Sequence, residues 1–233
     1  MTGINSFQQH LARGALVGVI ASRAALVQAT RLRRPPDFFE LRLDALRDSL
    51  GAVARTILQL RAPLLLTARH PAEGGLGNLR LAARRDLLRR FLEHAAGVDL
   101  ELRSVRQMEP LREEIQRRQI ALILSSHHLR DTPPVATLRA EANAAAAAGA
   151  TIFKVATRTD NAAQLGRLGS FFATHGAPVP VAAMGMGKLG RLSRQRLAAL
   201  GSVLQYAALG PPPHVAGQPS LSQLQRTRRA YIE

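Results

Sequence analysis

The sequence predicts a single α/β domain, a (β/α)8 TIM barrel spanning residues 1–233. Two observations predict this fold. Eight short apolar segments recur at intervals of roughly 27 residues, the spacing of a strand, a helix and their turns. Charged residues accompany several of these segments, as in barrel enzymes that carry their chemistry at strand ends. A doubly wound open sheet is the alternative architecture.

The eight expected strands are the apolar segments themselves. They are Ala15–Ala21, Phe38–Asp44, Pro63–Arg69, Val98–Arg103, Ile120–Ser126, Ala150–Ala156, Pro178–Met184 and Ser202–Ala207. The first follows Arg13 and is short enough to resemble the apolar part of a secretory signal. We favour a strand because Arg23 ends the run and a helical pattern follows. No apolar run reaches the roughly 18–20 residues of a membrane span, so we expect a cytoplasmic protein without membrane contact.

Helices are expected between the strands. Ser49–Leu60 and Leu79–Ala95 carry apolar residues every three or four positions. Thr137–Ala148 is rich in alanine, and Gly149 after it is typical of a helix end. A helix between successive strands allows them to run parallel, which supports the barrel.

The composition excludes several chemistries. The 233 residues include 32 Lys and Arg against 16 Asp and Glu, a formal charge of +16, and no cysteine. Disulfides, thiolate metal sites and a cysteine nucleophile are therefore excluded. No metalloprotease, phosphate-loop, dinucleotide or nucleophile-elbow motif occurs. His127 and His128 are adjacent and would face opposite sides of a strand, so we expect no zinc site there.

Only two of the basic residues are lysines, Lys154 and Lys188. Arginine keeps its proton at working pH and cannot act as an amine nucleophile. Lys154 lies in an apolar segment, whereas Lys188 lies among glycines and is typical of a loop. Lys154 is thus the candidate nucleophile, and a strand-end side chain that reaches solvent is the alternative.

Two expected strands carry charges at alternate positions, Glu40, Arg42 and Asp44 in one and Asp99, Glu101 and Arg103 in the other. Alternate residues share one face of a strand. Buried charges must pair, because an unpaired buried ion costs several kcal/mol. A half-exposed antiparallel sheet with one polar face is the alternative to a charged barrel interior.

Seven motifs then occur in a fixed order between about Leu16 and Leu224. They are Glu40-Leu-Arg42-Leu-Asp44; Thr67-Ala-Arg69 with Glu73-Gly74-Gly75; Asp99-Leu-Glu101; Ser125-Ser-His127 with Thr132-Pro133; Lys154-Val-Ala156; Met184-Gly-Met186-Gly-Lys-Leu-Gly190-Arg-Leu-Ser193-Arg194; and Gly201-Ser202 with Gly217-Gln218. With these motifs the chain resembles type I 3-dehydroquinate dehydratase, the lysine-dependent enzyme of the shikimate pathway.

The resemblance implies a (β/α)8 barrel, a homodimer, no metal or cofactor, and dehydration of the anionic substrate 3-dehydroquinate to 3-dehydroshikimate. By this resemblance Lys154 forms an imine with the C3 ketone. His127 removes the C2 proton and then protonates the departing C1 hydroxyl, and Glu73 orients His127. The chemistry fits these residues, because a protonated imine is a far better electron sink than a ketone. Histidine titrates near 6.5, so one residue can serve as base and then as acid.

The resemblance also implies a set of substrate-binding residues: Arg194 for the carboxylate, Glu40, Arg42 and Arg69 for the ring hydroxyls, and Gln218 from the last loop. His214 stands where the family has a serine that contacts substrate. Three further departures, which we interpret as packing changes, are His128, Leu129 and Thr151, where the family commonly has aspartate, phenylalanine and aspartate.

A nucleic-acid-binding protein is the rival interpretation, since the charge is +16 and the pI about 11.8. The arginines are dispersed over many helices and aromatic residues make up only 4% of the chain, too few for base stacking. We therefore expect no specific nucleic-acid partner. A related imine-forming lyase, such as an aldolase on the same barrel, is a third interpretation, and the His127 and Arg194 motifs favour the dehydratase over it.

Overall fold

The computed structural model describes residues 3–11, 14–174, 176, 178–210 and 215–230. Its eight strands form one sheet in the order β7-β6-β5-β4-β3-β2-β1-β8, and every ladder in it is parallel. The strands are β1 (Ala15–Ile20), β2 (Phe38–Arg42), β3 (Leu64–Thr67), β4 (Ala95–Glu101), β5 (Ala121–His128), β6 (Ile152–Arg158), β7 (Val181–Met186) and β8 (Leu204–Ala208). All eight predicted strands are present. Because all their ladders are parallel, the antiparallel alternative is wrong. Because β1 also pairs with β8, the doubly wound alternative is wrong as well.

The ring of strands closes between β7 and β8, the two ends of the ladder order. The Val203 N–H donates to the Val181 carbonyl at 3.2 Å. Beside it the Ser202 hydroxyl accepts from the Ala183 N–H at 3.0 Å and donates to the Ala183 carbonyl at 3.2 Å. We call these contacts the β7–β8 seam.

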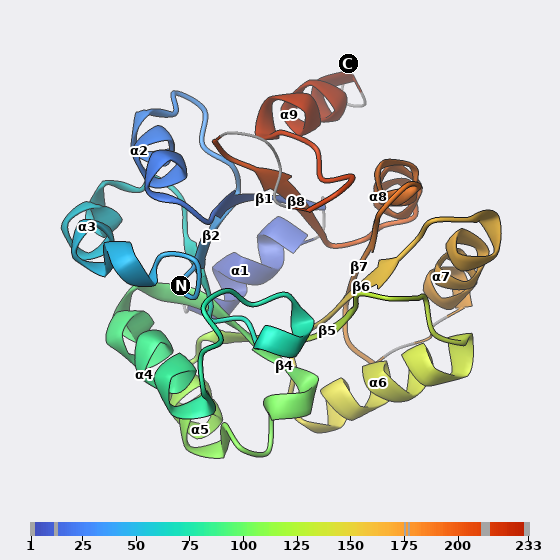
Figure 1. Ribbon diagram of the computed structural model, residues 1–233, viewed down its shortest axis with the longest axis horizontal. Helices are drawn as coiled ribbons and strands as arrows, with labels where there is room; N and C mark the ends of the chain where they lie inside the picture. The colour runs from blue at the N-terminus through green and yellow to red at the C-terminus, as the bar shows by residue number, and fades with distance from the viewer. Residues whose placement is uncertain (1–2, 12–13, 175, 177, 211–214, 231–233) are drawn as a thin grey trace.

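Helices surround the strands, as Figure 1 shows, and α1 crosses behind the centre of the ring. The helices are α1 (Gly3–Leu11), α2 (Arg23–Arg31), α3 (Leu50–Thr56), α4 (Leu81–Phe91), α5 (Glu109–Arg117), α6 (Val135–Ala147), α7 (Ala162–Thr174), α8 (Gly190–Ala199) and α9 (Leu221–Ala230). Gly149 has φ of +82° just after α6, so it ends that helix as predicted. Within the described part of the chain, no helix has the length and apolar content needed to cross a membrane.

Alternation along each strand separates two apolar layers. Phe39 and Leu41 face the helices and belong to the larger cluster between strands and helices. Phe38 faces the barrel interior, where it packs with Phe7 of α1. This interior cluster fills one end of the barrel.

The other end of the interior holds the charged residues, with one correction to the sequence analysis. Glu40, Asp99 and Glu101 are buried on the interior face, as alternation predicts. Arg103 is exposed, so its placement with them was wrong. β4 ends at Glu101 and the chain continues as a 3-10 turn, Leu102–Ser104, which breaks the period of two.

Candidate active site

Lys154 lies inside the barrel, in the middle of β6, and is 4% exposed. Its Nζ is 2.8 Å from Oδ2 of Asp99 and 3.5 Å from Oε1 of Glu40. The same nitrogen lies 4.0 Å from the centre of the Tyr206 ring. The alternative of a strand-end side chain in solvent is therefore wrong, and the amine has a fixed position between two carboxylates and an aromatic face.

Asp99 joins Lys154 to a second buried cation. Arg69 binds Asp99 through two hydrogen bonds of 3.0 and 2.8 Å. The Ser125 hydroxyl accepts from Arg69 and donates to Asp99, each at 2.6 Å. Burial alone raises the pKa of Asp99, but Arg69 and Lys154 outweigh it and hold that pKa well below its usual range. Asp99 is thus a carboxylate shared by two cations.

The remaining interior carboxylates are also held by donors. Glu40 accepts a hydrogen bond of 2.8 Å from the Thr67 hydroxyl. Glu101 lies 3.3 Å from Arg69, and its other oxygen accepts from Arg84 of α4 at 2.5 Å. Burial lowers the pKa of Arg69, yet Asp99 and Glu101 outweigh it and raise the pKa above its usual value. These pairings allow so many charges to share a buried space.

In the parallel β5–β6 ladder, Ser125 pairs with Lys154 and His127 pairs with Ala156. His127 therefore lies two residues closer than Lys154 to the carboxyl end of the strands. Oε2 of Glu73 is 2.9 Å from His127 Nδ1 and accepts the His127 backbone N–H at 3.1 Å. An oxygen already accepting the backbone N–H favours a proton on Nδ1, which leaves Nε2 free to act as a base.

Burial shifts the pKa values of both Glu73 and His127. It raises the pKa of Glu73 from 4.5 to about 7, against the opposing charge of Arg69. It lowers the pKa of His127 well below 6.5, with Arg69 and Lys154 adding to the effect. The imidazole is therefore neutral at neutral pH, as a base must be.

The loop after β3 places Glu73 at this point. Residues Pro71–Glu73 form a 3-10 turn, and Gly74 follows with φ of +84°. A side chain at Gly75 would place its Cβ 2.1 Å from the Arg69 carbonyl oxygen. The two glycines after Glu73 are thus required by the backbone rather than by the chemistry.

Arg42 and Asp44 tie this loop to β2. The Arg42 guanidinium donates to both Asp44 oxygens at 3.0 and 2.8 Å and to the Gly74 carbonyl at 3.3 Å. Asp44 also accepts the backbone N–H groups of Arg69 and Leu76. Burial raises the pKa of Asp44, but these donors outweigh it and lower the pKa. Arg42 therefore braces the loop that carries Glu73.

The two adjacent histidines face different neighbours, as predicted. Nε2 of His128 lies 3.0 Å from Glu141 of α6, on the opposite side of β5 from His127. Among the described residues, no group of three or more histidine and acidic side chains is arranged to hold a metal.

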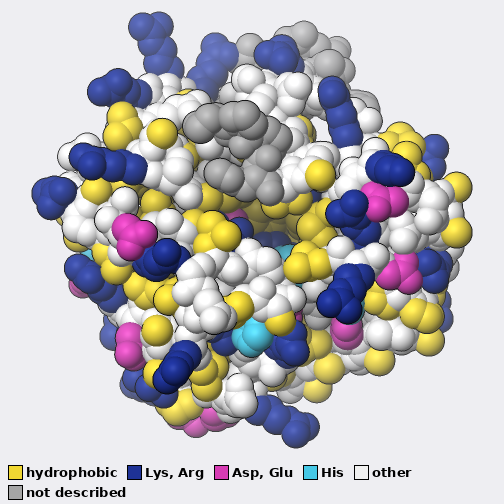
Figure 2. All heavy atoms as spheres, viewed as in Figure 1, with side chains coloured by type: hydrophobic (Ala, Val, Ile, Leu, Met, Phe, Trp, Pro, Cys, Tyr) yellow, Lys and Arg dark blue, Asp and Glu magenta, His cyan; other side chains and the backbone are white. Residues whose placement is uncertain are grey.

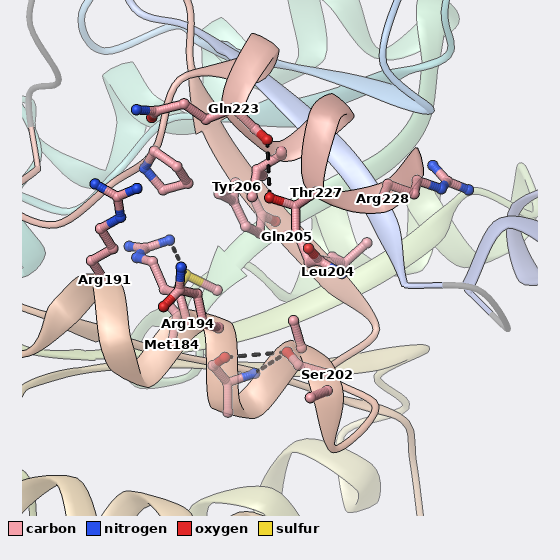
Figure 3. Close-up of a pocket in the computed structure, with 16 residues that line it drawn as sticks. Met184, Arg191, Arg194, Ser202, Leu204, Gln205, Tyr206, Gln223, Thr227 and Arg228 are labelled. Atoms are coloured by element: carbon pink, nitrogen blue, oxygen red, sulfur yellow. Dashed lines mark hydrogen bonds between the residues drawn. The ribbon is translucent and has the colours of Figure 1, made fainter. Parts of the chain in front are cut away.

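Arg194 extends from α8 toward the end of β7. Its Nε donates to the Gly185 carbonyl at 3.1 Å, and Nη1 lies 3.6 Å from the Met184 sulfur (Figure 3). Burial lowers the pKa of Arg194 to about 10. Gln218 lies in the loop whose Ala216 carbonyl accepts the Gly187 N–H at 3.2 Å, beside the start of α8. His214 lies outside the described residues.

The structure thus brings together Lys154, Glu40, Arg69, His127 and Glu73, with Arg42 at the rim. It also adds residues that the sequence analysis did not place in the site: Asp99, Ser125, Arg84 and Tyr206. Figure 2 shows a hollow near the centre of the face turned toward the viewer, with acidic and basic side chains visible in it. Alternation on β8 could have revealed Tyr206, because it puts Leu204 and Tyr206 on one face.

The fold and this site define an enzyme of the (β/α)8 class with a buried amine inside the barrel and an imidazole at the carboxyl end of a neighbouring strand. The family model of type I 3-dehydroquinase matches residues 17–231. The chain therefore belongs to the type I 3-dehydroquinase family, whose members are hydro-lyases of the shikimate pathway.

Individual relatives agree with the family model. The chain is 29% identical to the 3-dehydroquinate dehydratase of Methanosarcina barkeri over 231 residues, covering 93% of each chain. It is 31% identical over 192 residues to the bifunctional chloroplastic 3-dehydroquinate dehydratase/shikimate dehydrogenase of Arabidopsis thaliana, covering 81% of this chain but only 32% of that protein. The crystal structure of 3-dehydroquinate dehydratase from Geobacillus kaustophilus superposes with a TM-score of 0.83, 26% identity, and coverage of 94% of this chain and 91% of that one.

Proposed function

We propose that this 3-dehydroquinate dehydratase works through an imine between the Lys154 amine and the C3 ketone of its substrate. The observation that carries the proposal is the position of Lys154, buried inside the barrel and held by Asp99 and Glu40. The other lysine, Lys188, is exposed on the turn after β7. Imine formation needs an amine nucleophile, and the proton transfers that follow need a base on a neighbouring strand, which His127 supplies.

The proposed steps balance as a loss of one water. The Lys154 amine adds to the C3 carbonyl and expels water, which forms a protonated imine. His127 Nε2 takes the C2 proton, and the electron pair moves into the imine as an enamine. The enamine expels the C1 hydroxyl, which leaves as water with the proton from His127. Hydrolysis of the conjugated imine consumes one water and releases 3-dehydroshikimate and the free amine.

Glu73 is proposed to control the proton on His127. Its ionised form keeps the ring proton on Nδ1 and stabilises the imidazolium that forms when Nε2 accepts the C2 proton. The two bonds from one carboxylate oxygen to His127 support this role, because they fix both the ring and the backbone.

The substrate-binding roles are proposed by family likeness and by position. Arg194 would bind the carboxylate, and the interior group of Glu40, Arg42 and Arg69 would contact the ring hydroxyls. Gln218 would reach in from the loop before α9, and His214 would contact substrate from the same loop. We further propose one catalytic domain over residues 1–233 that acts as a homodimer in the cytoplasm; light scattering on the purified protein would measure the oligomer.

Borohydride reduction during turnover tests the imine. We expect an irreversible adduct of enzyme and substrate that peptide mass mapping places on Lys154. Lys154→Met should form none, while the matched control Lys188→Arg should be trapped as the wild type is. An adduct on Lys188, or turnover without any adduct, would overturn the proposal.

A further inference from the structure

The hydroxyl of Tyr206 is buried and has no hydrogen-bond partner among the described residues. The side chain is 5% exposed and belongs to the apolar cluster inside the barrel. A buried hydroxyl without a partner destabilises the folded state. Its presence here calls for an acceptor that the described part of the chain does not supply.

The Tyr206 ring already has a partner, the Lys154 nitrogen, 4.0 Å from its centre. The face of an aromatic ring attracts a cation. A lysine ammonium and a protonated imine both place positive charge on this nitrogen. The ring can therefore hold the nitrogen in the same place before and after substrate adds to it.

Tyr206 lines one cavity together with Arg194 and Met184. This cavity measures about 930 Å³ and lies between α8, β8 and α9 (Figure 3). Arg194 forms no ion pair with a carboxylate of the described residues; its contacts there are the Gly185 carbonyl and the Met184 sulfur. Arg194 carries a cationic donor and Tyr206 a neutral one, and no Asp or Glu is among the described residues that line their cavity.

A carboxylate fits this pair of donors. It would supply the counter-charge that Arg194 lacks and the acceptor that Tyr206 lacks. Burial, with Glu40 and Asp99 nearby, raises the pKa of Tyr206 well above 10, so the hydroxyl keeps its proton and can donate. The substrate of the proposed reaction carries one carboxylate.

We propose that Tyr206 is a substrate-binding residue whose hydroxyl donates a hydrogen bond to the carboxylate that Arg194 binds, while its ring holds the cationic nitrogen of Lys154. This inference rests on the proposed function of Lys154 and Arg194. The Tyr206 hydroxyl would bind the carboxylate and the ring would hold the Lys154 nitrogen. Different substitutions can test these two roles separately.

Tyr206→Phe removes the hydroxyl and keeps the ring. We expect KM for 3-dehydroquinate to rise about 10-fold, with kcat within about threefold of the wild type and borohydride trapping intact. The free variant should unfold at a temperature roughly 2–4 °C higher, because an unpartnered buried hydroxyl is gone. A structural role for the hydroxyl would instead lower that temperature. Tyr206→Leu, which also removes the ring, should slow trapping and lower kcat.

Shikimate and its methyl ester test the carboxylate contact directly, because neither has a ketone and both bind without an imine. The wild type should bind shikimate more tightly than the ester, and Tyr206→Phe should shrink that ratio about 10-fold. The control Phe38→Leu changes another aromatic of the barrel interior, one that packs against Phe7 of α1, and should lower stability without changing the ratio.

An unchanged KM and an unchanged ratio in Tyr206→Phe, with an active wild type, would overturn this inference and leave the imine mechanism standing. A wild type that forms no adduct on Lys154 would overturn both. The two failures are therefore distinguishable.

Discussion

One carboxylate oxygen of Glu73 lies 2.9 Å from the ring Nδ1 of His127 and 3.1 Å from its backbone nitrogen. The side chain that sets the tautomer of the proposed base thus also fixes the end of the strand that carries it. Since burial raises the pKa of Glu73 to about 7, its charge changes near neutral pH.

Glu73→Gln keeps the shape of this contact and removes its charge. We expect kcat to fall roughly 10-fold or more, because the imidazolium loses its counter-charge, while borohydride trapping on Lys154 persists. In the wild type kcat should rise with pH through about 7 as Glu73 ionises, and this inflection should be absent from the variant. A pH profile of steady-state rates measures both. An identical inflection in Glu73→Gln would show that another group sets it.

Stability provides an independent readout of the same substitution. A carboxyl with a raised pKa binds its proton more tightly in the folded chain, so its contribution to stability is lost as pH rises from about 4.5 to about 7. Glu73→Gln should therefore be more stable than the wild type above pH 7, by at most on the order of 3 kcal/mol. Urea unfolding at pH 5 and pH 8 would show the gain only at the higher pH.

His127 and His128 should differ sharply although they are neighbours. His127→Ala should lose roughly 10²–10⁴ in kcat and keep imine trapping, because it removes the base beside Lys154. His128→Ala removes a contact with Glu141 on the other side of β5 and should change kcat only a few-fold. Equal losses in steady-state assays of the two variants would refute the choice of His127.

Asp99→Asn should destabilise the protein by about 3–5 kcal/mol in urea unfolding at pH 7, because Arg69 and Lys154 would lose their shared counter-charge. The depressed pKa of Asp99 gives stability that is present above its unfolded pKa near 4 and is lost as pH falls below it. Asp86→Asn is the matched control, since Asp86 is exposed and pairs only loosely with Arg85. Its effect should stay within about 0.5 kcal/mol, and a loss as large as that of Asp99→Asn would contradict the argument.

His214→Ser tests the position where the chain departs from the family pattern. A protonated imidazole can give the substrate a charge-assisted hydrogen bond, but its ring is bulkier than serine. We expect the wild-type KM to worsen as rising pH removes the imidazolium, and the serine variant to show a lower KM that varies less with pH. Steady-state KM between pH 5.5 and 8 measures this. Equal KM values at every pH would mean that the histidine is a neutral replacement.

Much of the fold could be predicted because strand and helix periods are local properties. Strand limits were less accurate where the apolar pattern is weak. β4 begins at Ala95, three residues before the expected start, because Ala95–Gly97 lack the bulky apolar side chains that marked the other strands. The interior position of Glu40 was expected from alternation, whereas Lys154 was chosen as one of only two lysines and by its motif.

The pairing of the charges could not be predicted from the same pattern. Asp99 meets both Arg69 and Lys154 because β3, β4, β5 and β6 curve around a common axis, and no local period encodes distances across a barrel. The role of Arg84 was hidden for a related reason. It lies on a helix, where arginine is usually solvated, yet it is 1% exposed and reaches Glu101.

Mechanically, the barrel is a curved sheet whose two edge strands are held together by the contacts of the β7–β8 seam. Because the seam has few contacts, its hydrogen bonds should break before those of the ladders, in a local opening that leaves most of the protein folded. Deuterium exchange should then be fastest, among the strands, at amides such as that of Val203. Lys154 and Asp99 lie in ladders that such an opening leaves intact, whereas Tyr206 lies on the strand that moves. The part of the site formed by β8, which carries Tyr206, should therefore be the most easily deformed. Ligands that contact Tyr206 should slow deuterium exchange of the amides in the seam.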